Sequence, residues 1–201
     1  MRDSLLLAAL LAVGLTGCAA DDSAPTPTDS PTPPVSGPTA EPTPDAAEPE
    51  FRMPTACADA LPASRIDELD GLGMELLAGP DGRYGDSFLA DPTPEQLAGG
   101  ITCIWGEEEV PENSVTISIA PVTPATRDAI VTGLVDQALN IIEQGDLRIY
   151  ARIGDSVAAP AIINLVRPTS WISVITGLGG EEQYDWAVEL ADDVSTQVGA
   201  S

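Results

Sequence analysis

The residues of this chain that could do acid–base chemistry are almost all carboxylates. The 201 residues include 32 Asp and Glu and eight Arg, but neither His nor Lys. Without these two residue types, Ser-His-Asp and Cys-His sites are excluded, and so is Schiff-base catalysis. The densest carboxylates, Glu107, Glu108, Glu109 and Glu112, fall in a polar turn between two predicted strands, so we expect a solvated tip. A calcium site is the alternative, although their spacing is not that of an EF-hand. We expect no metal, no cofactor and no catalytic residue.

A more specific chemistry is indicated at Cys18. Leu15-Thr16-Gly17-Cys18 closes an apolar run from Leu5 to Leu15. This run is too short to span a bilayer, which needs about 20 residues, but it suits the apolar region of a signal peptide. Leu, two small residues and Cys resemble a bacterial lipobox, which predicts a signal peptide over 1–17 and fatty acyl chains (palmitate) on Cys18. The partner would then be the cell membrane, on its extracytoplasmic face. The alternatives are an ordinary secretory signal with another cleavage site and a buried helix.

The remaining two cysteines, Cys57 and Cys103, form an even pair in what would be an oxidising compartment. We predict a disulfide between them. Two buried free thiols or a metal pair are the alternatives, although without His or a third Cys a zinc or copper site is disfavoured.

Composition divides the chain after the predicted lipidation site. Residues 18–50 are rich in Pro and Thr and predict a disordered linker. Residues 51–201 predict one globular domain, with 24 Asp and Glu against seven Arg and hence a formal net charge of −17. That charge argues against nucleic acid as a partner, because nucleic-acid binding needs cations to neutralise phosphates. Its simplest role is solubility, and a surface for a cation or a basic partner is the alternative.

Periodicity places both helices and strands in the predicted domain. Helical patterns cover 61–69, 93–97, 123–145 and 181–198, and strand patterns cover 74–77, 101–105, 115–119, 147–153, 161–167 and 171–176. The second and third of these strands predict a hairpin with a turn over Gly106 to Asn113. Strict alternation in the third strand predicts that its Thr116 and Ser118 face is the wetter one.

Tryptophan and arginine supply the remaining candidates for a binding site. For the tryptophans we expect core packing, with a ligand groove as the alternative; they are Trp105, Trp171 and Trp186. For Arg148, Arg152 and Arg167 we expect ion pairs rather than an anion site. Asp192 and Asp193 predict an exposed helix face.

Four motifs occur in an order that resembles a known family. They are Cys57 before a Leu-Pro-x-Ser helix, Cys103-Ile104-Trp105-Gly106 opening a hairpin, Ile153 to Val157 after a helix, and Leu190-Ala191 in the last helix. Together they resemble small actinobacterial envelope lipoproteins of the LpqN type and the sensor domains of some mycobacterial kinases. The resemblance implies an α+β fold, in which an antiparallel sheet packs with helices as an α/β sandwich, with a disulfide and no catalytic residues.

From these features we expect a membrane-anchored lipoprotein whose non-enzymatic domain binds a small ligand or another envelope protein. The rival hypotheses are a carboxylate-dependent envelope hydrolase and a scaffold subunit of an envelope complex.

Overall fold

The computed structural model of the chain describes residues 50–200, apart from the side chain of Ser87. The predicted signal peptide, Cys18 and nearly all of the predicted linker lie outside these residues. Four α-helices, two 3-10 turns and seven strands are present in the described part. The helices and turns are η1 Cys57–Asp59, α1 Ala63–Gly71, η2 Gly85–Phe88, α2 Pro94–Leu97, α3 Arg127–Asp136 and α4 Glu181–Gln197. The strands are β1 Glu75–Ala78, β2 Ile101–Glu107, β3 Val110–Pro121, β4 Asn140–Gln144, β5 Leu147–Arg152, β6 Ile162–Val166 and β7 Ser170–Thr176.

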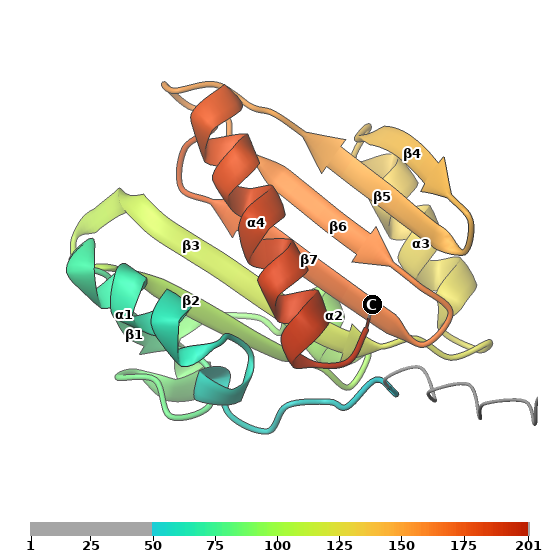
Figure 1. Cartoon of the computed structure of the whole chain (residues 1–201), viewed down its shortest axis with the longest axis horizontal. Helices are drawn as coiled ribbons and strands as arrows, with labels where there is room; N and C mark the ends of the chain where they lie inside the picture. The colour runs from blue at the N-terminus through green and yellow to red at the C-terminus, as the bar shows by residue number, and fades with distance from the viewer. Residues whose placement is uncertain (1–49, 201) are drawn as a thin grey trace, which may run out of the picture. The chain divides into compact units, whose positions relative to one another are not determined.

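All seven strands form one antiparallel sheet in the order β1-β2-β3-β7-β6-β5-β4. Strand β3 of the β2–β3 hairpin pairs with β7, and β6, β5 and β4 extend the sheet on the other side of β7 (Figure 1). The antiparallel sheet with helices confirms the predicted α+β fold.

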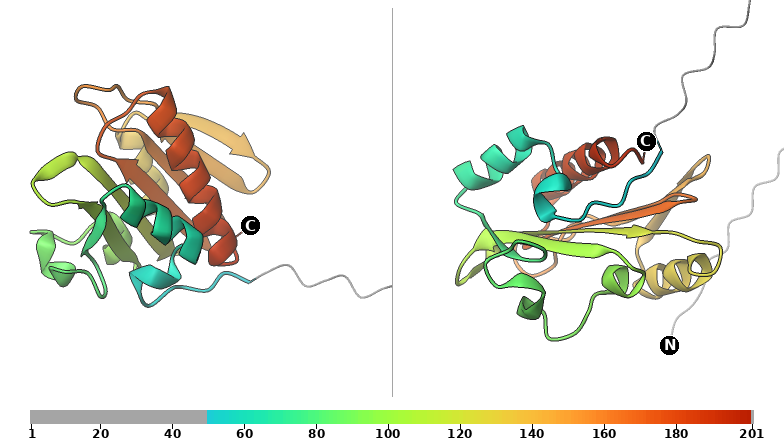
Figure 2. Two further views of the ribbon diagram at one scale, coloured as in Figure 1. Left: turned by 60° about the vertical axis from the view of Figure 1, so that its left-hand side comes forward. Right: turned by 90° about the horizontal axis from the view of Figure 1, so that it is seen from below.

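One face of the sheet carries the larger core. Helices α1 and α4 lie on this face, and α2 and α3 lie on the other (Figure 2). Alternate strand residues point to each face, so the face under α4 collects the aliphatic side chains of the central strands. Residues of this cluster with no exposed surface include Leu69, Val115, Ile117, Ile119, Ile172, Val174, Leu190 and Val194. A smaller cluster on the other face packs Ile130 and Leu134 of α3 against Val166 and Trp171.

Cys57 and Cys103 connect η1 to β2. Their Sγ atoms are 2.06 Å apart and their Cα atoms 5.7 Å apart, which is the geometry of a disulfide. Both residues are fully buried. Gly79 passes directly beside them with φ of 101°, and a Cβ built there would lie 2.7 Å from Cys57 Sγ and 2.3 Å from the Thr102 carbonyl oxygen. Glycine is therefore required where β1 leaves the sheet.

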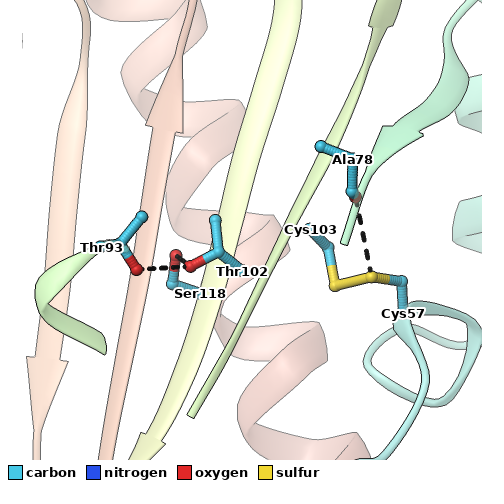
Figure 3. The surroundings of a disulfide bond; sticks show 6 residues. All are labelled: Cys57, Ala78, Thr93, Thr102, Cys103 and Ser118. Carbon is cyan, nitrogen blue, oxygen red and sulfur yellow. Dashed lines mark hydrogen bonds between the residues drawn. A yellow bond between two sulfur atoms is a disulfide. The ribbon is translucent and has the colours of Figure 1, made fainter. Parts of the chain in front are cut away.

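The Thr116 and Ser118 face of β3 is only in part the wetter face that its alternation predicts, because Thr116 is half-buried whereas Ser118 is buried. Thr102 and Ser118 are cross-strand neighbours whose side-chain oxygens are 2.9 Å apart, and Thr93 Oγ1 lies 2.7 Å from Thr102 Oγ1 (Figure 3). Thr93 also caps α2 in a reciprocal capping box with Gln96. The hydroxyl groups of Thr102 and Ser118 are thus satisfied by one another and by Thr93 at the start of α2.

The prediction of one helix over 123–145 is wrong for the residues after Asp136. Helix α3 ends at Asp136, and Ala138 then takes a left-handed φ of 54°. Ile141 and Ile142 lie on strand β4, where Ile142 pairs with Ile149 of β5. The predicted turn of the β2–β3 hairpin is also too long, because the strands continue to Glu107 and from Val110, and Glu109 turns the chain with φ of 66°.

Candidate functional site

The candidate site is a groove at the end of the β2–β3 hairpin, on the face of the sheet away from α4. We call it the hairpin groove; its volume is about 710 Å³. Its lining comprises Leu77, Tyr84, Phe88, Ile104, Glu107, Glu108, Glu109, Pro111, Ser114 and Thr116. Ligand sites in proteins are usually concave, largely apolar and of similar volume.

The sheet supplies the floor of the hairpin groove. Ile104 and Thr116 are cross-strand partners on β2 and β3. Leu77 of β1 is buried beside them, while Ile104 and Thr116 are half-buried. The floor therefore offers aliphatic surface with one hydroxyl group.

The segment between β1 and α2 supplies an aromatic wall. The backbone N–H groups of Arg83 and Tyr84 donate to the carbonyl oxygens of Leu76 and Leu77 at 3.0 and 2.9 Å, which holds the segment against β1. The rings of Tyr84 and Phe88 stack with centroids 5.7 Å apart. These side chains remain 37% and 45% exposed, so the wall offers aromatic surface that a ligand would cover.

The hairpin tip supplies an acidic wall beside the aromatic one. Glu107, Glu108 and Glu109 are consecutive and exposed. Glu108 accepts a hydrogen bond from the Tyr84 hydroxyl and forms an ion pair with Arg83, whose Nη1 lies 3.1 Å away. These contacts join the two walls. The charge of Glu108 raises the pKa of Arg83, and the hydrogen bond to Glu108 raises the pKa of Tyr84.

Local charge in the hairpin groove is negative after its ion pairs are counted. Arg83 Nη1 also pairs with Glu75 at 2.8 Å, so one guanidinium faces two carboxylates. Glu107 accepts a hydrogen bond from Asn113 Nδ2 at 3.2 Å, which is a neutral partner. Glu107 and Glu109 therefore leave a net negative wall beside an apolar floor, an arrangement that favours a cationic ligand with an apolar part.

Only part of the acidic turn predicted from the sequence belongs to this groove. Glu112 instead lines a separate depression between α1 and α4, together with Trp186 and other acidic residues. Trp186 is half-buried and its Nε1 donates to Glu68 at 3.3 Å, whereas Trp105 and Trp171 are buried in the core. Within residues 50–200, no group of three or more Cys, Asp and Glu side chains is arranged to hold a metal ion.

The arginines singled out in the sequence do not form a common site. Arg148 pairs with Glu143 at 3.3 Å, and Arg152 is exposed. Arg167 is half-buried and donates to Ser195 Oγ at 3.0 Å, and burial lowers its pKa. Asp193 does not simply face solvent, because its Oδ2 lies 2.7 Å from Nη2 of Arg65 on α1 and so links α1 to α4.

Sequence reasoning missed two features of this face of the sheet. Tyr84 and Phe88 were not singled out, although two aromatic residues four apart in a glycine-rich segment are a usable signal. Glu95 of α2 is a buried carboxyl group, 7% exposed. Its pKa is raised by burial, and the hydrogen bonds with Thr93 and Ser173 lower this pKa by a smaller amount. It is not among the residues that line the hairpin groove.

Comparisons of the chain with protein-family models, with curated proteins and with solved structures find no match. The resemblance to envelope lipoproteins of the LpqN type therefore stays a prediction. No helix within the described range is long and apolar enough to cross a membrane.

Proposed function

We propose that this chain is a lipid-anchored extracytoplasmic protein whose domain binds a basic segment of another envelope protein in the hairpin groove. The observation that carries the proposal is the pairing of an apolar, aromatic floor and wall with three consecutive exposed glutamates. The anchoring part rests on Leu15-Thr16-Gly17-Cys18 and the apolar run before it.

A basic peptide segment fits the hairpin groove for two reasons. Its cationic side chains would pair with Glu107 and Glu109, which have no arginine partner among their described contacts. Its apolar side chains would cover Phe88 and Ile104, which removes apolar surface from water. The formal charge of −17 over 51–201 would also accelerate the approach of a basic partner at low ionic strength.

The rival proposal of a carboxylate-dependent hydrolase has less support. A catalytic acid of that type needs a carboxyl group with a raised pKa beside its substrate. Within residues 50–200, the carboxyl group whose pKa is raised is Glu95, which belongs to α2 and is not among the residues that line the hairpin groove. A scaffold subunit would also bind another envelope protein, and it would differ from our proposal only in forming a more stable complex with that protein.

The test uses the full chain carrying Cys18→Ser and a synthetic eight-residue peptide of alternating Arg and Val. We expect the peptide to bind with an affinity that falls as salt rises. Because an exposed ion pair contributes about 0.3–1 kcal/mol, the loss of two pairs in Glu107→Gln/Glu109→Gln should weaken binding about three- to thirtyfold. Phe88→Ala should weaken it with an unchanged salt dependence.

The matched control is Asp67→Asn/Asp70→Asn, which removes the same two charges from exposed positions on α1, on the opposite face of the sheet. The proposal requires that this variant bind the peptide within about twofold of the parent, the scatter expected for distant surface sites. Equal weakening by both double variants would show attraction to the whole acidic domain, and would refute a site in the groove.

A further inference from the structure

A second cavity lies between α2 and α3, on the same face of the sheet as the hairpin groove but lined by none of its residues. We call it the interhelical pocket; its volume is about 340 Å³. Its lining comprises Pro94, Leu97, Ala98, Ala125, Thr126, Ala129, Ile130, Gly133, Leu134, Gln137 and Trp171.

None of these lining residues is ionisable, although the domain around them is strongly acidic. The two polar side chains already have partners in their own segment. Gln137 Nε2 donates to the Gly133 carbonyl oxygen at 3.2 Å, and Thr126 Oγ1 lies 3.0 Å from Thr123 Oγ1. A charged ligand would lose its hydration here without gaining an opposite charge, which is costly.

The inner end of the interhelical pocket is aromatic. Trp171 of β7 is 4% exposed, and its Nε1 donates to Asn164 Oδ1 at 2.9 Å. Because the polar edge of the indole is satisfied within the sheet, the surface that it contributes to the pocket is hydrocarbon. Leu97, which is 77% exposed, lines the pocket from α2 and offers further apolar surface to an occupant.

Small residues keep the α3 side of the pocket open. Ala129 and Gly133 lie one turn apart on the same side of α3, and Ala125 lines the pocket from just before the helix. A Cβ built on Gly133 would meet no atom within 4 Å, so the space beside this helical glycine is empty. Glycine inside a helix costs roughly 0.5–1 kcal/mol relative to alanine, and no close contact compensates for that cost here.

We propose that the interhelical pocket is a binding site for a compact, uncharged apolar molecule of two or three rings. A lining without charge, an indole at the inner end and a wall of small side chains together select against charged ligands and favour a flat hydrocarbon surface. An engineered apolar cavity of about 150 Å³ binds benzene, and the interhelical pocket has roughly twice that volume.

The probe is N-phenyl-1-naphthylamine, which is neutral and becomes fluorescent in apolar surroundings. Its matched partner is 1-anilinonaphthalene-8-sulfonate, which has the same rings and one negative charge. The measurement uses the full chain with Cys18→Ser in about 0.5 M salt, where charges more than a few ångströms apart are largely screened. We expect saturable binding of the neutral probe and at least tenfold weaker binding of the sulfonate.

The variant Gly133→Leu tests whether the neutral probe binds in the interhelical pocket. It fills the interhelical pocket while replacing a helix-disfavouring residue by a good helix former, so binding should fall at least tenfold without a drop in melting temperature. Gly71→Leu is the matched control, because a Cβ built on Gly71 of α1 also meets nothing within 4 Å. This variant should bind as the parent does.

Three results would overturn the assignment: no saturable binding by the parent, equal binding of the two probes, or unchanged binding by Gly133→Leu. If Gly133→Leu unfolds, Ala129→Leu gives the same test from the neighbouring turn of α3, where residue 129 is exposed. Because no residue is shared with the hairpin groove, the basic peptide should bind Gly133→Leu normally, and the two proposals can fail separately.

Discussion

Reduction of the Cys57–Cys103 disulfide should destabilise the domain by an amount that the loop length sets. The two cysteines are separated by 46 positions in the sequence. In the chain-entropy model, closing a loop of this size removes unfolded-state entropy equivalent to about 4 kcal/mol at 25 °C. For a domain of 150 residues or more, 1 kcal/mol shifts the melting temperature by about 2–4 °C. The expected fall is therefore about 8–16 °C.

The assay compares two preparations of the full chain with Cys18→Ser, so that no third thiol can exchange. Both are unfolded in guanidinium and refolded, one with a phosphine reductant throughout and one without. Circular dichroism then gives the two melting curves. Because both sulfur atoms are buried, addition of reductant to the folded protein should act slowly, at the rate at which the domain opens.

The result that would refute this reasoning is a difference below about 2 °C between the two preparations, which corresponds to less than about 1 kcal/mol. The unfolded state would then already bring residues 57 and 103 together, or the folded state would hold the bond under strain. The double variant Cys57→Ala/Cys103→Ala should melt lower than reduced parent protein, since it also removes two buried sulfur atoms from the core.

Three further predictions concern other parts of the chain. Replacing Cys18 with Ser should release the protein from the membrane fraction into the medium, and retention of this variant would contradict the lipobox. Deleting 21–48 should change the melting temperature by less than about 2 °C if this segment does not pack on the domain, and a large fall would show that it does. Burial raises the folded-state pKa of Glu95, so its contribution to stability is greatest below the unfolded-state pKa and is lost as pH rises through the folded-state value. The melting temperature of Glu95→Gln should therefore rise relative to the parent between pH 4 and pH 7, and a difference independent of pH would contradict the burial of this carboxyl group.

Elements with a strong local signal could be predicted from the sequence. The alternation in Val115-Thr116-Ile117-Ser118-Ile119 identified the centre of β3, and Thr93-Pro94 identified the start of α2, where the capping box forms. These signals suffice because cap chemistry and side-chain alternation act over a few residues.

The segment after α3 could not be predicted because two periodicities fit it. Ile130, Leu134, Ala138 and Ile141 have helical spacing, yet Ile142 pairs with Ile149 across a turn at Gly145 and Asp146. The backbone pairing of β4 with β5, together with the left-handed Ala138, ended the helix early. Tertiary pairing of this kind overrides local propensity.

The hairpin groove was predictable only on its acidic side. Consecutive glutamates before a strand indicate an exposed tip, but the aromatic wall comes from residues 84 and 88, about twenty positions earlier in the chain. The antiparallel pairing of β1 with β2 brings that segment to the hairpin, starting from the register of Glu75 with Gly106. Nothing in the local sequence of either segment specifies this pairing.

If Cys18 anchors the chain as proposed, the Cys57–Cys103 disulfide also provides a path for mechanical tension through the domain. A pulling force enters at Phe51, first acts on the backbone hydrogen bond from Arg52 to Val198, and reaches Cys57. From there the covalent bond offers a direct path to β2, which bypasses the backbone of the closed loop over 58–102. That loop contains the aromatic wall of the hairpin groove and the α2 wall of the interhelical pocket. Each proposed site would therefore have one wall outside this covalent path when tension acts through the proposed tether.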